Sequence, residues 1–167
     1  NMITIVNPSE IEPHTTKIEV VPYKDKKKYQ LVKKFNIENL NNSKIGFGIK
    51  RADNHEQPDI GKKNITILDK YEALYMGNKD LPYIYLTFDL GYEAGYTEKI
   101  LEVLKKEKVI GTFFITAHYL NTQPELVKRM IDEGHIVGNH TVNHKSMPSC
   151  SLETIKKEVM DLHAAIY

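Results

Sequence analysis

The sequence predicts an α/β fold with parallel strands, and three observations support this class. Between residues 81 and 167, short apolar runs alternate with stretches of helical periodicity in the order β-α-β-α-β-loop-α. The runs are rich in β-branched and aromatic residues, as in strands buried within a parallel sheet. The content of 41% hydrophobic and 27% charged residues is that of an ordinary globular chain. Such an order is typical of parallel strands joined by right-handed crossovers.

Length, charge and cysteine content set limits on the function. The 167 residues suit one domain, which can bury about two-thirds of its unfolded surface. The formal net charge of +1 gives no reason to expect a nucleic-acid partner. No apolar stretch approaches the ~20 residues of a membrane span, and the N-terminus lacks the pattern of a signal peptide. Cys150 is the single cysteine, so no internal disulfide forms and the compartment stays undecided.

Three segments follow one another along the chain. Residues 1–45 are expected to form a small α+β appendage, with a strand at 16–23 and a helix at 27–40. Residues 46–80 are a loop-rich lead-in with one short helix near 65–74. Residues 81–167 carry the regular alternation and are expected to form the main domain.

The first half of that domain is expected to contain two strands and one helix. The run "YIYLTF" at 83–88 predicts the first strand, and "GTFFIT" at 111–116 predicts the second. Thr97 is the expected N-cap of the helix between them. The apolar residues that share one face of this helix are Ile100, Leu101 and Leu104.

The second half is expected to add two helices and one strand. Pro124 suits the first turn of a helix that ends at Gly134. The run "HIVG" at 135–138 predicts a third strand, and Ser151 is the expected N-cap of a final helix. The residues expected to face the core from these two helices are Leu126, Val127, Met130, Ile131, Ile155, Val159, Leu162 and Ile166.

Chemistry-bearing residues gather at one edge of the predicted sheet. Asp89 ends the first strand and His140 follows the third. Because the carboxyl ends of parallel strands open on the same edge, these residues can meet although 51 positions separate them. His140 and His144 form an H-x3-H pair that can bind one metal ion if the segment turns. No Glu follows His140, so the segment lacks the metalloprotease motif H-E-x-x-H.

Each of these features also has a plain structural interpretation. An aspartate after a strand is commonly a cap or turn residue, and two histidines are common in a loop. Cys150 could complete a His2Cys zinc set, although an incidental thiol is the favoured interpretation. His118 is a candidate pocket residue. The histidines with no nameable partner are His14, His55, His135 and His163.

The two segments that carry these residues resemble a known family. They are "LTFDLGYEAGYTEKILEVLKKEKVIGTFFITAHYL" from Leu86 and "ELVKRMIDEGHIVGNHTVNHKSM" from Glu125. Together they resemble the first part of a NodB-type polysaccharide deacetylase domain of carbohydrate esterase family four. The likeness is strongest to delta-lactam-biosynthetic muramic acid de-N-acetylases. It covers residues 46–167 and implies the first half of a distorted (β/α) barrel.

The resemblance implies roles for three residues. Asp89 matches the catalytic base of the family motif Thr-Phe-Asp-Asp-Gly, and His140 and His144 match its metal ligands. Leu90 stands where the family has a carboxylate ligand, so metal binding is expected to be weak, with water or substrate oxygens completing the set. The implied ion is divalent, and imidazole ligands favour zinc, with cobalt or nickel as alternatives. The later motifs of the family, including its general acid, have no counterpart before Tyr167.

The resemblance also implies a function, a partner and a location. The function is metal-dependent de-N-acetylation of peptidoglycan, at N-acetylmuramic acid of the spore cortex, outside the cytoplasmic membrane. The implied partner is a glycan strand. The chain is expected to be a truncated part of the enzyme, inactive alone, whose exposed sheet edges invite self-association. The alternatives are an inactive wall-binding module, in which Leu90 has abolished the metal, and a purely structural domain.

Overall fold

A computed structural model describes residues 41–53, 56–71, 73–78 and 80–167. Contacts divide the chain into two compact units, 1–41 and 42–167, and the second unit is the one described below. The strand expected at 16–23 and the helix expected at 27–40 lie outside the described residues. The proposed boundaries at 45 and 80 stay predictions.

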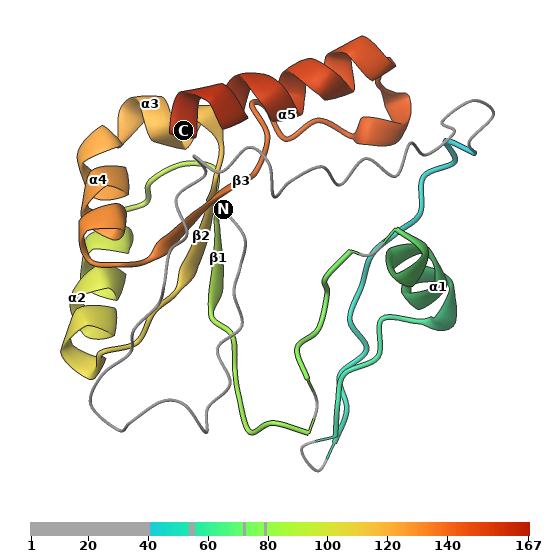
Figure 1. Cartoon of the computed structure of the whole chain (residues 1–167), viewed down its shortest axis with the longest axis horizontal. Coiled ribbons are helices and arrows are strands. Elements are labelled where there is room, and N and C mark those ends of the chain that lie inside the picture. Colours follow the sequence, from blue (N-terminus) through green and yellow to red (C-terminus); the bar gives the residue numbers. More distant parts are fainter. Residues whose placement is uncertain (1–40, 54–55, 72, 79) are drawn as a thin grey trace, which may run out of the picture. The chain divides into compact units, whose positions relative to one another are not determined.

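A three-stranded parallel sheet forms the centre of the second unit (Figure 1). It consists of β1 (Thr87–Leu90), β2 (Thr112–Ile115) and β3 (Ile136–Asn139), in the order β1-β2-β3. Both pairings are parallel, which confirms the predicted class and connectivity.

The helices complete an order that is close to the predicted one. They are α1 (Lys62–Lys70), α2 (Thr97–Glu107), α3 (Ala117–Thr122), α4 (Pro124–Asp132), the 3-10 helix η2 (Met147–Ser149) and α5 (Leu152–Ile166). The short helix α3 was not expected, because its N-cap Thr116 falls inside the run that predicted the second strand. The helix expected near 65–74 begins and ends earlier, at Lys62 and Lys70.

Strand boundaries differ from those predicted because each strand needs a partner. The first strand was expected at 83–88 but covers Thr87–Leu90. Its pairing starts where Thr112 N donates to Leu86 O at 2.9 Å, and β2 offers no partner to the residues before Leu86. The second strand is one residue shorter at each end than expected, and the third lies one residue later.

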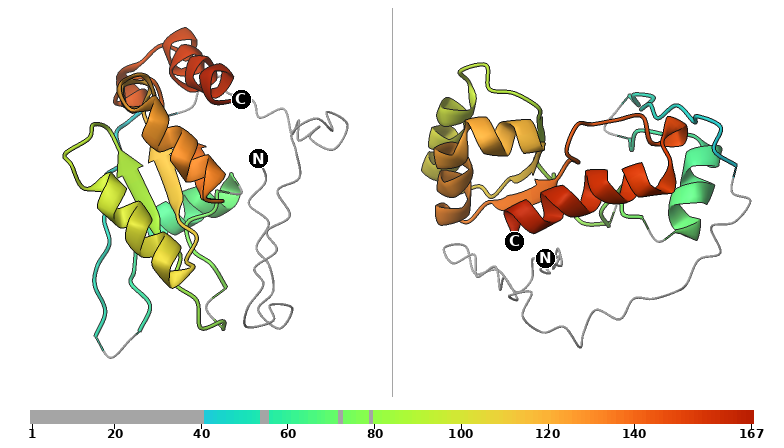
Figure 2. Two further views of the ribbon diagram at one scale, coloured as in Figure 1. Left: turned by 90° about the vertical axis from the view of Figure 1, so that its left-hand side faces the viewer. Right: turned by 90° about the horizontal axis from the view of Figure 1, so that it is seen from above.

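One face of the sheet is covered by helices and holds the core (Figure 2). Phe113 and Ile115 of β2 are fully buried there, as are Leu101 of α2 and Met130 of α4. The partly buried Ile166 of α5 packs against the same cluster. Ile131 was expected to face the core but is 55% exposed, because the inward face of α4 is formed by the neighbouring buried positions.

The opposite face of the sheet carries a close approach at Gly138. A Cβ atom added to Gly138 would lie 2.5 Å from Cδ1 of Phe114, the residue paired with it in β2. Any larger residue at this position would force the Phe114 ring to move.

The loop between β1 and α2 is fixed by Glu93 rather than by the predicted cap. Glu93 Oε1 accepts from the backbone N of Gly95 at 2.6 Å, of Tyr96 at 2.9 Å and of Thr97 at 3.2 Å. The Tyr119 hydroxyl donates to Glu93 Oε2 at 2.8 Å and lies 3.0 Å from Thr97 Oγ1. Thr97 makes no side-chain cap, so that expectation was wrong. The cap expected at Ser151 is confirmed, since its side chain accepts from Thr154 N.

Replacing Glu93 with Gln is expected to destabilise the fold by about 1–2 kcal/mol, the usual cost of losing a charged helix cap. Burial opposes ionisation of Glu93, but the hydrogen bonds from Thr97, Tyr119 and Gly95 outweigh it and lower the pKa to about 2. A depressed carboxyl pKa stabilises the fold above the ordinary value of 4.5 and loses this effect as the pH falls through about 2. Denaturant unfolding from pH 2 to 7 measures both effects. In Glu98→Gln, an exposed position in the first turn of the same helix, the acid dependence should survive.

His135, which had no expected partner, is a buried core residue. It is 7% exposed, and its Nδ1 accepts from Gly111 N at 3.2 Å. Its ring contacts Phe113 edge-on at a centroid distance of 5.3 Å. Burial lowers the pKa of His135, against the opposing effect of Glu133. The neutral ring is therefore the form that the fold accepts.

The His135→Asn variant is expected to lose part of the pH dependence of stability. With a folded pKa below the ordinary value of 6.5, the unfolded chain binds more protons just below pH 6.5. The free energy of unfolding is therefore highest above pH 6.5 and falls as the pH drops below it. Thermal unfolding between pH 4.5 and 8 should show a flatter profile for the variant. The exposed His118 gives a control, since His118→Asn should keep the original slope.

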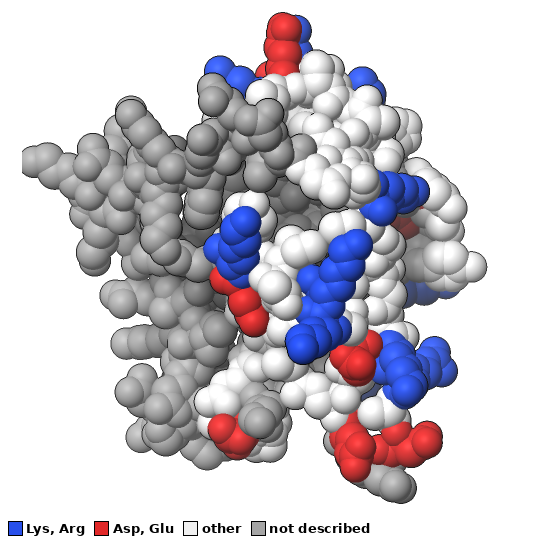
Figure 3. Space-filling model, turned by 90° about the vertical axis from the view of Figure 1, so that its right-hand side faces the viewer, with Lys and Arg blue, Asp and Glu red and all other residues white. Residues whose placement is uncertain are grey.

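The described surface carries charges of both signs. Figure 3 shows Lys and Arg side chains interspersed with Asp and Glu on the face drawn there. Within the described part of the chain, no helix has the length and apolar character needed to cross a bilayer.

Candidate functional site

The two predicted metal-ligating histidines lie in one tight loop directly after β3. His140 N donates to Ile115 O at 3.0 Å, so the ladder of the sheet continues to this residue. The chain then turns, and the ring centroids of His140 and His144 come to lie 4.6 Å apart with an interplanar angle of 40°. Metal–nitrogen bonds are about 2.0–2.1 Å long, so two imidazoles at this separation are close enough to share one ion. The pair is therefore a candidate site for a divalent cation.

Asp89 lies on the face of the sheet opposite to the core. Phe88 and Leu90 pack against the helix-covered core, and successive strand residues point to opposite faces. Asp89 is exposed and pairs across the sheet with Phe114, which pairs with Gly138. The bond from His140 N to Ile115 O extends the ladder beyond β3, and the alternation of the strand predicts the face of Gly138 for His140. Two strand spacings separate β1 from β3, about 10 Å between backbones, a span that an ion and a water can occupy between side chains.

The face occupied by Leu90 explains how a leucine is accommodated beside Asp89. Leu90 is partly buried against the core cluster and pairs with the fully buried Ile115 of β2. An apolar side chain at this position adds packing to the core. It leaves the histidine pair without a carboxylate ligand from β1.

The backbone of the histidine loop is held at every amide. His140 is paired with Ile115, and the remaining four bonds are Thr141 N to Asn139 Oδ1 (2.8 Å), Val142 N to Glu158 O (3.0 Å), Asn143 N to Glu158 Oε2 (2.7 Å) and His144 N to Thr141 Oγ1 (3.0 Å). Thr141 and His144 adopt left-handed conformations, with φ of 67° and 53°. Each such non-glycine residue costs about 1–3 kcal/mol, so these bonds maintain a strained loop.

The other candidate residues lie apart from this pair or make different contacts. Among the described residues, no group of three or more His, Cys, Asp or Glu side chains is arranged to hold a metal ion. Cys150 Sγ lies 3.5 Å from Ser146 O, and His118 is an exposed residue of α3. The His163 ring contacts the Tyr167 ring, with a distance of 4.9 Å between their centroids. His14 and His55 fall outside the described residues.

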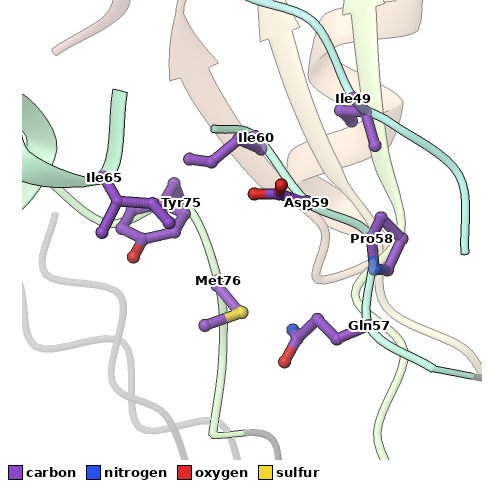
Figure 4. A pocket seen from close by; sticks show the side chains of 8 residues that line it. All are labelled: Ile49, Gln57, Pro58, Asp59, Ile60, Ile65, Tyr75 and Met76. Carbon is purple, nitrogen blue, oxygen red and sulfur yellow. The ribbon is translucent and has the colours of Figure 1, made fainter. Parts of the chain in front are cut away.

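A pocket in the described part of the chain is lined by residues of the lead-in segment, and none of the predicted site residues is among them (Figure 4). Its walls include Ile49, Ile65, Tyr75 and Met76, with Asp59 among them. Asp59 N and O pair with Lys50 in an isolated antiparallel bridge. The chemistry of these walls is mostly apolar, so the histidine loop, which carries ligating side chains, remains the candidate site.

Sequence reasoning did not identify two residues that shape the site. Glu93 fixes the loop that follows Asp89, and Glu158 of α5 holds the histidine loop. A signal for Glu158 was present, because it lies between Ile155 and Leu162 within the apolar stripe of its helix. A charged residue at such a position is buried and needs partners.

The fold and the motif residues together define a class, and the chain belongs to the polysaccharide deacetylase family. The sequence profile of that family, described as polysaccharide deacetylase, matches residues 77–167. The chain is 47% identical over 130 residues to the peptidoglycan-N-acetylmuramic acid deacetylase PdaA of Bacillus subtilis, covering 78% of this chain and 49% of that protein. This confirms the predicted resemblance.

Solved structures support the same assignment of the fold. The structure of Bacillus subtilis PdaA, a family 4 carbohydrate esterase, matches with a TM-score of 0.73 at 47% identity, over 77% of this chain and 55% of that one. A family 4 carbohydrate esterase from Bacillus anthracis matches with a TM-score of 0.62 at 46% identity, over 64% of this chain and 51% of that one. The chain thus spans about half the length of the curated relatives that it matches.

Proposed function

We propose that the protein is a metal-dependent peptidoglycan deacetylase that removes the acetyl group from N-acetylmuramic acid. The observation that carries this proposal is the pair of imidazoles, with ring centroids 4.6 Å apart, at the carboxyl end of a sheet whose first strand bears the exposed Asp89. The name of PdaA, a peptidoglycan-N-acetylmuramic acid deacetylase 47% identical to the chain, supports the choice of substrate. Spore cortex peptidoglycan and delta-lactam formation are part of the proposal.

Three residues carry the proposed chemistry. His140 and His144 would hold the ion, and Asp89 would accept a proton from the attacking water. A divalent ion supplies a water of low pKa and stabilises the negative charge that develops on the acetyl oxygen. Zinc is the proposed ion because both ligands are imidazoles, with cobalt and nickel as substitutes. Leu90 has no donor atom, so His140 and His144 are the protein ligands that would hold the ion.

The proposal also includes where the protein acts and what this chain contributes. A peptidoglycan substrate requires action outside the cytoplasmic membrane. Residues 81–167 provide the first half of the deacetylase domain, residues 46–80 the lead-in and residues 1–45 an appendage. Among the described residues, β1 and β3 are the edge strands of the sheet, and we expect them to allow self-association by strand pairing.

Acetate release from spore-type peptidoglycan tests the proposal. The full-length protein is incubated with the polymer, with and without a chelator, and free acetate is measured. Release that stops on chelation and returns with added zinc is the expected result. Acetate release at an equal rate with and without the chelator would contradict a metal-dependent mechanism.

The alternative function is an inactive glycan-binding module, favoured by Leu90 at the ligand position. Sedimentation with peptidoglycan and no release of acetate at any zinc concentration would support this alternative against the enzyme.

A further inference from the structure

The loop between the two histidines is held from outside by one residue of α5. Glu158 is 3% exposed, yet both of its carboxylate oxygens are used by the loop. Oε2 accepts from Asn143 N at 2.7 Å, and Oε1 accepts from Asn143 Nδ2 at 2.8 Å. The carbonyl oxygen of Glu158 accepts from Val142 N at 3.0 Å. One residue therefore fixes both positions that lie just before His144.

The charge of Glu158 is balanced by the same loop. Lys145 Nζ lies 3.6 Å from Oε1 of Glu158, and Lys145 directly follows His144. Burying a carboxylate is unfavourable unless it is hydrogen-bonded and paired. Among the described residues, the carboxylate of Glu158 bonds to Asn143 and pairs with Lys145, so the buried charge stabilises the loop rather than the helix that carries it.

The backbone is strained on both sides of Val142 and Asn143, the two residues that bond to Glu158. Thr141 and His144 have positive φ values, which ordinary side chains disfavour. Without the two bonds to Asn143, the loop could relax to a wider turn, and the imidazoles of His140 and His144 would move apart. The conformation that brings the rings to 4.6 Å thus depends on a residue outside the motif.

We propose that Glu158 is a positioning residue that sets the separation of His140 and His144 and so the affinity of this pair for a divalent ion. This inference rests on the proposed function, because it gives the histidine pair a metal to bind. Residues outside the ligand set that orient the ligands typically change metal affinity by about 10- to 100-fold.

The test compares Glu158→Gln with a matched control from the same helix. Glu153→Gln is the control, because Glu153 is 78% exposed and pairs with Lys157 rather than with the loop. Zinc affinity is measured by competitive titration, and the visible spectrum of the cobalt-loaded protein reports ligand geometry. Glu158→Gln should bind zinc about 10- to 100-fold more weakly and show an altered cobalt spectrum, while Glu153→Gln matches the wild type.

Two further variants separate positioning from folding. Asn143→Ala keeps the backbone bond to Oε2 and loses only the side-chain bond, so it should fold and show a smaller loss of zinc affinity. In the double variant Glu158→Gln with Asn143→Asp, the new carboxylate accepts from the new amide, and zinc affinity should recover. For the single variant Glu158→Gln, kcat for acetate release should fall at low zinc and recover in excess zinc, while KM for glycan stays unchanged.

The outcomes distinguish this inference from the function on which it depends. If the wild type binds zinc and both Glu158→Gln and Asn143→Ala bind it equally well, Glu158 supports only the fold and the positioning role is wrong. If the wild type itself binds no divalent ion, the proposed function fails first, and the positioning role fails with it.

Discussion

Replacing Asp89 with Asn is expected to lower acetate release by about 100- to 10,000-fold, the usual contribution of a positioned general base. The amide keeps the size and the exposed position of the side chain in β1 but cannot take a proton from water. Zinc affinity should stay within a few fold of the wild type, because Asp89 is not assigned as a ligand. Steady-state release of acetate, together with zinc titration, measures both quantities.

Asp161→Asn is the control for this result. Asp161 is an exposed carboxylate of α5 and takes no part in the proposed chemistry, so its variant should keep full activity. Activity of Asp89→Asn within threefold of the control would assign the base to another residue.

Replacing either His140 or His144 is expected to weaken zinc binding, and activity is expected to fall because the ion is lost. His140→Gln or His144→Gln should weaken zinc binding by more than about 100-fold, beyond the loss typical of residues that only orient ligands. With two imidazoles as the assigned protein ligands, the loss of one leaves a single donor. Bound zinc after dialysis, measured by atomic emission, and activity over a range of zinc concentrations report the effect.

His163→Gln separates a ligand effect from a general loss of imidazole. His163 lies in the last turn of α5, where its ring contacts that of Tyr167, and it is not part of the histidine loop. Its variant should retain zinc and activity. A histidine-loop variant that keeps its zinc would show that the ion, if bound, lies elsewhere.

The connectivity of the fold could be predicted from sequence because it depends on local patterns. Apolar runs and helical periodicity are properties of neighbouring residues, and they predicted three parallel strands that alternate with helices along the chain. Strand ends could not be predicted as well, because pairing decides them, and β1 begins where β2 offers partners. The helix α3 was not predicted, because a helix of six residues shows little periodicity in the sequence.

The candidate site shows the same division between local and tertiary information. Asp89, His140 and His144 could be chosen from their spacing and from the family motif. The residues that fix their surroundings could not, because Glu93 bonds to Tyr119, 26 positions away, and Glu158 bonds to Asn143, 15 positions away. Contacts of this kind form only when helices and loops meet in the folded chain.

The most direct test is a crystal structure of the full-length protein soaked with zinc, with the ion located by anomalous scattering. The expected ion lies within about 2.1 Å of a nitrogen from both His140 and His144, and the Asp89 carboxylate lies one water molecule away from it. An ion bound elsewhere, or an Asp89 carboxylate too far from the ion to share a water with it, would contradict a common site at the carboxyl end of this sheet.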